Sequence, residues 1–181
     1  MGVVTPGRQY GRVRRRLVAL TLAIAALGAC GGSGAAGPPD QGEVTKITDG
    51  DTLRVQLNGG VEEKVRMIGI DTPEVHGRGG LRECFGKEAS AELGRLVPVG
   101  TTVRLEIDAE PRDRYGRLLA YVYRLPDDLH INLEMAERGF AAPLTIPPNV
   151  AFADDFVGAA ASARDAGRGL WSACGGPDKQ I

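Results

Sequence analysis

The sequence is poor in the residues from which zinc sites are built. It contains two histidines and three cysteines among 181 residues. His76 falls in a glycine-rich loop and His130 is expected at the surface, and neither has a second ligand at metal-binding spacing, so no zinc site is predicted. Hydrophobic residues make up 43% and charged residues 25%, which is the balance of a soluble globular protein. The length suits one ordinary domain with appendages.

A surplus of positive charge is also lacking. Five of the 22 basic residues and none of the 23 acidic ones precede Cys30, so the rest of the chain has 17 basic against 23 acidic residues, a net charge of about −6. A protein that coats nucleic acid by bulk positive charge is therefore excluded. Any phosphate site must be local.

No apolar run is long enough for an ordinary transmembrane helix of about 20 residues. The uncharged stretch from Leu17 to Leu27 follows a basic cluster at Arg12 to Arg16, which is the layout of an export signal. It ends at the sequence Leu-Gly-Ala-Cys, which resembles the lipobox of bacterial lipoproteins. That resemblance implies that Cys30 receives a diacylglyceryl group and becomes the mature N-terminus.

Two other interpretations of this segment stay open: a buried apolar helix with an incidental cysteine, and ordinary secretion with cleavage near Ala29. Two acyl chains would anchor the product stably. We therefore expect export and a lipid anchor at Cys30, facing outside the cytoplasm, with secretion as the alternative. The expected organisation is a signal (1–30), a flexible tether rich in Gly and Pro (31–42), a folded domain (43–174) and a tail (175–181).

Two cysteines then remain, Cys84 and Cys174, in a compartment that permits oxidation. We expect them to form a disulfide between the loop after residue 74 and the C-terminus. Across about 90 residues, the chain-entropy model gives such a bond roughly 4 kcal/mol of stabilisation. The alternative is a pair of unrelated buried thiols.

The folded part is expected to be α+β and mainly a β-barrel. Alternating apolar residues predict strands, Asn58-Gly59 predicts a hairpin, and helical spacing predicts helices, the last of which Asn149 would cap. The strands are expected within 43–50, 51–60, 61–71, 101–108 and 118–123, and the helices within 85–97, 131–140 and from 150 to Gly167 or Gly169. This order is that of an OB-type barrel, the five-stranded OB-fold, with three added helices.

The predicted hairpin brings two acidic motifs together. Asp51 begins the second strand and Asp71 ends the third, and in an antiparallel pair these two ends lie side by side. Neighbouring carboxylates repel unless a cation lies between them, and oxygen ligands favour a hard ion such as Ca²⁺ or Mg²⁺. Each motif alone is also a common turn sequence. Their joint placement is what predicts a metal site.

Two arginines complete this set. Arg66 lies on the strand that leads to Asp71, and Arg117 precedes the fifth strand. A planar, permanently charged guanidinium suits a phosphodiester, whose transition state gathers negative charge on its oxygens. The alternative for each arginine is a solvated side chain or a surface ion pair.

Six motifs together resemble the staphylococcal nuclease (thermonuclease) family, in order and at compatible spacing over about residues 43 to 174. They are "DGDT", "RMIGIDTPE", "FGKEASAEL", "DRYGRLLAYVY", "NLEMAERGFA" and "GLWSAC". The resemblance implies a Ca²⁺-dependent nuclease that hydrolyses DNA or RNA phosphodiesters at the 5′-oxygen and leaves 3′-phosphates. The partner is then nucleic acid, the chain is expected to be a monomer, and no obligate protein partner is inferred.

The resemblance also implies a role for particular residues. The metal ligands would be the carboxylates of Asp51 and Asp71 and the backbone carbonyl of Thr72, with Asp49 in the outer coordination shell. Glu74 would act as general base or position the attacking water. Arg66 and Arg117 would hold the scissile phosphate and stabilise the transition state.

The chain departs from the family pattern where substrate would bind. Arg114 stands where a well-studied member has a lysine, and Tyr115 beside it either offers a stacking face or packs the turn. The segment "AAPLTIPPN" lacks the tyrosine pair that contacts the nucleotide. Two other functions stay open: an exported OB module that binds oligonucleotides or other polyanions without cleaving them, and a structural lipoprotein.

Overall fold

The computed structural model describes residues 1–2, 39–75, 82–177 and 179. Every strand and helix described below belongs to the unit Ala35–Ile181. The predicted signal, Cys30 and His76 lie outside the described residues. Within those ranges no helix is long and apolar enough to cross a membrane.

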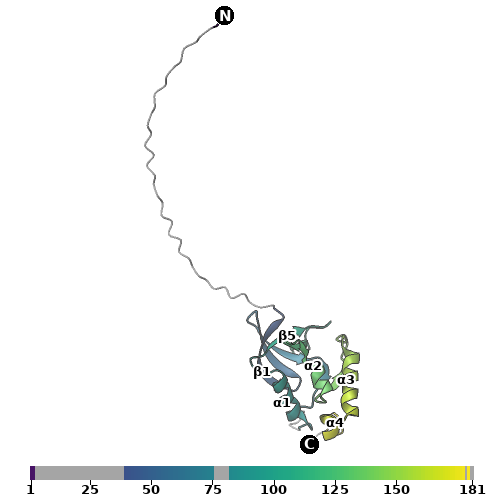
Figure 1. Ribbon diagram of the computed structural model, residues 1–181. Helices are drawn as coiled ribbons and strands as arrows, with labels where there is room; N and C mark the ends of the chain where they lie inside the picture. The colour runs from purple at the N-terminus through teal and green to yellow at the C-terminus, as the bar shows by residue number, and fades with distance from the viewer. Residues whose placement is uncertain (3–38, 76–81, 178, 180–181) are drawn as a thin grey trace. The chain divides into compact units, whose positions relative to one another are not determined.

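Five strands form a closed barrel (Figure 1). They are β1 (Gln41–Asp49), β2 (Thr52–Leu57), β3 (Glu62–Met67), β5 (Thr102–Glu106) and β6 (Leu118–Arg124). Their order is β3-β2-β1-β5-β6, and parallel pairing of β3 with β6 closes the ring. The short strand β7 (Leu129–His130) pairs with β6. The predicted α+β fold with a five-stranded OB-type barrel is confirmed.

The third predicted strand, 61–71, is interrupted in the structure. After β3 the chain bends at Ile68, and a separate strand β4 (Gly69–Asp71) pairs with β8 (Ala142–Leu144) instead of continuing the barrel. Gly69 has a φ of 84°, and a Cβ there would lie 2.1 Å from Cε2 of Phe156. Only glycine fits this bend, which carries Asp71 out of the barrel wall.

Three long helices occupy the predicted segments: α1 (Gly86–Leu96), α2 (Ile131–Glu137) and α3 (Ala153–Asp165). A fourth, α4 (Leu170–Ala173), is a single turn that was not predicted. Gly139 and Gly167, with φ of 77° and 61°, follow the ends of α2 and α3 as expected. The prediction that Asn149 caps the last helix is wrong, because α3 begins only after Phe152.

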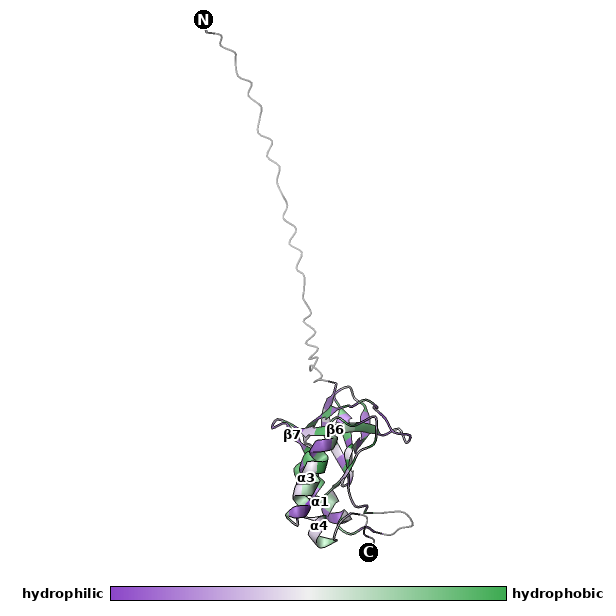
Figure 2. Cartoon of the chain, turned by 90° about the vertical axis from the view of Figure 1, so that its right-hand side faces the viewer, coloured by the Kyte–Doolittle hydropathy of each residue, from purple (hydrophilic) through white to green (hydrophobic). Residues whose placement is uncertain are grey.

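The core fills the barrel and the space under the helices. Fully buried side chains come from every barrel strand and from α1, α2 and α3. Figure 2 shows β6 in predominantly hydrophobic colours, whereas α3 carries both hydrophobic and hydrophilic residues. The buried set includes Val44, Leu53, Val65, Val103, Val122, Leu93, Met135 and Phe156.

The prediction that His130 lies at the surface is wrong. Its ring stacks on Tyr123 at a centroid distance of 4.6 Å and meets Phe152 edge-on at 5.2 Å. Its Nε2 is buried without a hydrogen-bond partner among the described residues. Burial lowers the pKa of His130 to about 4. His130 directly precedes α2, and its ring lies in an aromatic cluster that the local sequence did not indicate.

The predicted disulfide is present. Cys84 and Cys174 are joined with an S–S distance of 1.99 Å and a Cα–Cα distance of 6.0 Å. The bond links the residues before α1 to the end of α4, two helices that lie at the same end of the domain (Figures 1 and 2). Residues 90 positions apart in sequence are thereby held together.

Candidate active site

Strand register brings the two acidic motifs together as predicted. In the β2–β3 hairpin Thr52 pairs with Arg66, and the Met67 N–H donates a 2.9 Å hydrogen bond to the Asp51 carbonyl. The chain then turns through β4, so that Asp71 comes back towards Asp51. Asp51 is 3% exposed, whereas the Asp71 side chain is 43% exposed. The pair therefore has one buried and one accessible carboxylate.

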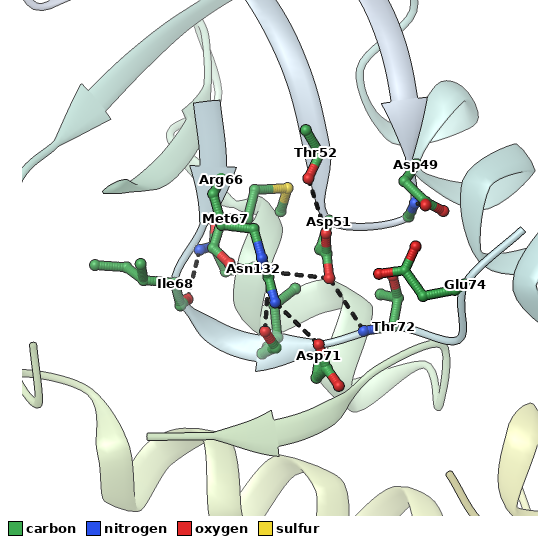
Figure 3. Close-up of polar contacts among 12 residues, drawn as sticks. Asp49, Asp51, Thr52, Arg66, Met67, Ile68, Asp71, Thr72, Glu74 and Asn132 are labelled. Atoms are coloured by element: carbon green, nitrogen blue, oxygen red, sulfur yellow. Dashed lines mark hydrogen bonds and ion pairs between the residues drawn. The ribbon is translucent and has the colours of Figure 1, made fainter. Parts of the chain in front are cut away.

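Arg66 lies between these carboxylates (Figure 3). Its guanidinium is 2.9 Å from Oδ2 of Asp51 through Nη1 and 2.9 Å from Oδ1 of Asp71 through Nη2. Nη1 also donates to the carbonyls of Met67 and Ile70 at 2.6 and 3.1 Å. A largely buried side chain held by two acids and two carbonyls has one geometry, so the orientation of its guanidinium is fixed.

Thr72 closes the cluster next to Asp51. Its N–H donates to Oδ2 of Asp51 at 3.2 Å. Its Oγ1 is buried and has no hydrogen-bond partner within the part of the chain that the structure describes. A Cβ on Gly50 would lie 2.7 Å from this oxygen, so glycine is needed there for the two turns to approach. An unpaired buried oxygen beside two carboxylates favours a cation.

Glu74 turns its carboxyl group towards Asp49 and Asp51 (Figure 3). The residue as a whole is exposed, but the pKa of its carboxyl group is raised to about 8. The causes are partial burial of the carboxyl group first, then the hydrogen bond and negative charge of Asp49, and then the charges of Asp51 and Asp71. The carboxyl groups of Asp49, Asp51, Asp71 and Glu74 thus lie close to one another, with Arg66 between Asp51 and Asp71. Such crowding favours either a bound proton or a bound cation.

Arg117 and Arg66 both line a cavity of about 510 Å³. The parallel pairing of β3 with β6 places Arg66 opposite Leu119, two residues after Arg117. Nε of Arg117 donates to Oδ2 of Asp113 at 2.6 Å, and its side chain is 27% exposed. Both predicted arginines therefore face one cavity, and Arg117 keeps part of its guanidinium accessible.

The rim of this cavity is exposed. Tyr115 is 70% exposed, so it does not pack the turn, and Nη2 of Arg114 donates to its hydroxyl at 2.6 Å. Leu144 and Ile146 line the wall where the family pattern has tyrosines, and Ile146 is 63% exposed. This part of the cavity lining is thus aliphatic, with the ring of Tyr115 beside it.

Two positioning residues were not identified from the sequence. Asp113 accepts the N–H groups of Tyr115 and Arg117 and also binds the Arg117 side chain, so it fixes the turn before β6. Asn132, fully buried in α2, accepts from the Val122 N–H and donates to the carbonyls of Ile68 and Ala120. Only the turn propensity of Asp113 could have indicated the first, and nothing local indicates the second.

Among the described residues no group of three or more His, Cys, Asp or Glu side chains meets the geometry of a metal site. The predicted ligand set contains only two carboxylates and a backbone carbonyl, so it does not depend on such a group. The structure brings Asp51, Asp71 and Thr72 together, with Asp49 and Glu74 beside them and Arg66 between Asp51 and Asp71. Arg66 also lines the cavity that Arg117 lines, and the lining of that cavity does not include these acids.

A family model described as "Staphylococcal nuclease homologue" matches residues 64–173, more than half of the chain. The chain belongs to the staphylococcal nuclease family. The matching region contains Arg66, Asp71 and Arg117, and the residues just before it supply β1, β2 and Asp51. The expectation drawn from the six motifs is therefore confirmed at the level of the family.

Named relatives support the same assignment. A thermonuclease of Staphylococcus intermedius is 41% identical over 106 residues, which is 59% of this chain and 61% of the relative. A thermonuclease of Staphylococcus hyicus is 35% identical over 130 residues, 72% of this chain and 75% of the relative. The SPbeta prophage-derived endonuclease YokF of Bacillus subtilis is 35% identical over 129 residues, 70% of this chain but 42% of the relative. The family and these relatives support a nuclease, a hydrolase, as the enzyme class.

Proposed function

We propose that this protein is a Ca²⁺-dependent nuclease that hydrolyses phosphodiester bonds of DNA, RNA or both at the 5′-oxygen and leaves 3′-phosphates. The observation that carries the proposal is the placement of Arg66, which contacts Asp51 and Asp71 at 2.9 Å each and faces the same cavity as Arg117. An oxyanion in this cavity would meet two guanidinium groups beside a cluster of acids. A module that only binds polyanions has no need of the buried acids.

The residues present fit a hard divalent cation. The Asp51 and Asp71 carboxylates and the Thr72 backbone carbonyl would hold Ca²⁺, and Asp49 would lie in the outer coordination shell. The raised pKa of Glu74 reflects burial and the negative charge of the neighbouring acids, which a bound cation would offset, and Thr72 Oγ1 is a buried oxygen beside them. Bound at this position, the ion would polarise a phosphoryl oxygen.

The side chains supply the remaining chemistry. Glu74, turned into the cluster, would accept a proton from the attacking water or orient that water. Arg66 and Arg117 would neutralise the charge that develops on the phosphoryl oxygens, each contributing about 3 kcal/mol. Arg114 and Tyr115 on the rim would contact the nucleotide next to the scissile phosphate, through charge and through stacking on the exposed ring.

The proposal includes a location. The basic cluster, the apolar run and Cys30 support export with a lipid anchor on the outer face of the cell membrane, and secretion is the alternative. The Cys84–Cys174 disulfide supports an oxidising compartment. The substrate would then be extracellular nucleic acid. Mass spectrometry of the membrane fraction tests this directly, because a lipidated N-terminal Cys30 supports the anchor and a free N-terminus near residue 30 supports secretion.

A cleavage assay tests the activity. The purified protein is incubated with matched single-stranded DNA and RNA in Ca²⁺ or in a chelator, and product ends are determined by mass spectrometry. We expect cleavage that requires Ca²⁺ and yields 3′-phosphates, and a loss of about 10²- to 10⁴-fold in Glu74→Gln. Glu62→Gln, an exposed acid on β3 paired with Arg54, is the control and should cleave normally. Binding without cleavage would support the non-catalytic module.

A further inference from the structure

We propose that Glu83 is a positioning residue that fixes the backbone of Glu74, and that the Cys84–Cys174 disulfide holds Glu83 in place. The inference rests on the proposed function, because it concerns where the general base is held. Neither Glu83 nor Glu74 is among the residues that line the cavity with Arg66 and Arg117. Glu83 is joined to the acidic cluster by its hydrogen bonds with Glu74, so we expect it to act on catalysis through Glu74.

Glu83 and Glu74 are joined by two hydrogen bonds in opposite directions. The Glu83 N–H donates to the Glu74 carbonyl at 3.0 Å, and the Glu74 N–H donates to Oε2 of Glu83 at 2.8 Å. Both backbone polar groups of Glu74 are thus bound by one residue, nine positions further along the chain. We call this pair of bonds the Glu74–Glu83 clip. A residue held at both its N–H and its C=O has little freedom to shift.

The first residue of helix α1, Gly86, contacts the clip. The Gly86 N–H donates to the Glu83 carbonyl at 3.3 Å. A Cβ on Gly86 would lie 2.8 Å from both the carbonyl carbon and oxygen of Glu74 and 2.9 Å from the Pro73 oxygen. The start of α1 is therefore in direct contact with the backbone of the proposed base, and there is no room for a side chain between them.

The disulfide fixes the segment between the clip and the helix. Cys84 follows Glu83 directly and is bonded to Cys174 at the end of α4. Phe85, the next residue, has a φ of 75° and stacks on Phe140 at a centroid distance of 5.2 Å. This non-glycine residue in the left-handed region needs its surroundings to hold it. The disulfide at Cys84 and the aromatic contact of Phe85 itself are two such restraints.

The expected consequence is kinetic. Displacing a catalytic group by about 1 Å can cost about 10²-fold in rate, whereas substrate affinity is set by groups on the cavity wall. Loss of the clip should therefore lower kcat and leave KM nearly unchanged. A purely structural role for Glu83 would lower stability without this separation of kcat from KM.

The direct test compares Glu83→Ala with Glu83→Gln. The glutamine keeps a carbonyl oxygen that can accept the Glu74 N–H, and alanine does not. We expect kcat to fall about 10- to 100-fold in Glu83→Ala with KM within about threefold, and to return to within about threefold in Glu83→Gln. Glu62→Ala is the matched control. Equal kcat in Glu83→Ala and the unaltered protein would overturn the inference.

A second pair of variants tests the contact without removing a charge. Gly86→Ala should push on the Glu74 carbonyl and lower kcat about tenfold. Gly94→Ala lies in the same helix, where a Cβ would meet only Cγ1 of Ile47 at 3.9 Å. It should leave kcat unchanged. If both variants behaved alike, contact between α1 and the Glu74 backbone would have no catalytic consequence.

The disulfide is tested by the double variant Cys84→Ser with Cys174→Ser. We expect a fall in kcat of the same kind as in Glu83→Ala, at temperatures where the barrel stays folded. Amide hydrogen exchange of the metal-free protein gives a readout that needs no activity. The Glu74 N–H should exchange about tenfold or more faster in Glu83→Ala and in the double variant than in Glu83→Gln.

These measurements separate the two proposals. If the unaltered protein shows no Ca²⁺-dependent cleavage, the proposed function fails, while fast exchange at Glu74 in Glu83→Ala would still support the clip. If the protein cleaves and the Glu74 N–H exchanges at the same rate with and without the Glu83 carboxylate, the clip is contradicted and the nuclease assignment stands.

Discussion

On the acidic side of the site, Asp51 is 3% exposed and accepts hydrogen bonds from Thr52 and Thr72 in addition to its contact with Arg66. On the rim, Tyr115 is 70% exposed and Ile146 is 63% exposed. The acidic side is built by strand register and buried bonds, and the rim by loop side chains with few restraints. The residues proposed to perform the chemistry are therefore placed by the barrel, whereas those proposed to contact the substrate can vary without disturbing it.

The largest contrast is expected between the two arginines. Both Arg66→Lys and Arg117→Lys should lower kcat about 10²- to 10³-fold, because each loses a guanidinium aimed at the phosphate. Only Arg66→Lys should also cost about 2–3 kcal/mol of unfolding free energy, since Arg66 binds the buried Asp51 and two carbonyls. Arg117→Lys should cost less than about 1 kcal/mol. Single-turnover cleavage measures the effect on kcat, and urea denaturation measures the unfolding free energy. Equal stability losses in the two variants would contradict this difference between the arginines.

Two asparagine variants should differ in their loss of unfolding free energy. Asn132→Ala should cost about 3 kcal/mol, because it leaves the Val122 N–H and the carbonyls of Ile68 and Ala120 without their bonds. Asn149→Ala, behind the rim, loses two bonds to the Glu110 backbone and should cost about 1 kcal/mol. Urea denaturation of the two variants is the measurement. A larger loss in Asn149→Ala would mean that the rim is held more firmly than the acidic side.

Protonation of His130 should destabilise the aromatic cluster at the start of α3. His130 is half-buried there, and its pKa of about 4 lies below the ordinary value near 6.5. As pH falls from about 6.5 to 4, the unfolded chain takes up this proton first, so stability declines.

Because the ring is only partly buried and Glu106, Asp155 and Asp128 favour its charged form while Arg104 opposes it, we expect the loss to be about 1–2 kcal/mol. Thermal unfolding of the wild type and His130→Phe over this range is the measurement. The variant should lack this component of the pH dependence. Parallel curves for both proteins would show that another group is responsible.

The smallest expected effect is a gain on the rim. Ile146→Tyr places an aromatic ring on the cavity wall and should lower KM for single-stranded DNA about fivefold, from about 1 kcal/mol of base stacking. Val157→Tyr, an exposed aliphatic on α3 that does not line this cavity, is the control. Initial-rate kinetics should show unchanged kcat in both variants. A fall in KM in the control alone would contradict the assignment of the rim.

Much of the acidic side could be predicted because its geometry is local. The Asn58–Gly59 hairpin fixes the register of β2 against β3, and register alone places Asp51 beside Arg66 and near Asp71. The alternating strands and the glycines after α2 and α3 were predicted for the same reason. In each case, a short stretch of sequence contains the whole physical cause.

The failures concern contacts between distant segments. Asn149 has the composition of a helix cap, but its side chain binds Glu110, 39 residues earlier, and the helix starts later. The bend at Gly69 depends on Phe156 of α3, which the strand pattern does not contain. His130 is buried by aromatic residues from β6 and α3. Tertiary packing decided each of these positions, and local propensity could not.

We expect Asp51 and Asp71 to form the site of a single hard cation. Calorimetric titration of Ca²⁺ into the wild type, Asp51→Asn and Asp71→Asn tests it most directly. We predict one ion bound per wild-type chain and an affinity loss of about tenfold or more in either variant, because each removes a charged ligand. Unchanged stoichiometry and affinity in both variants would contradict the account.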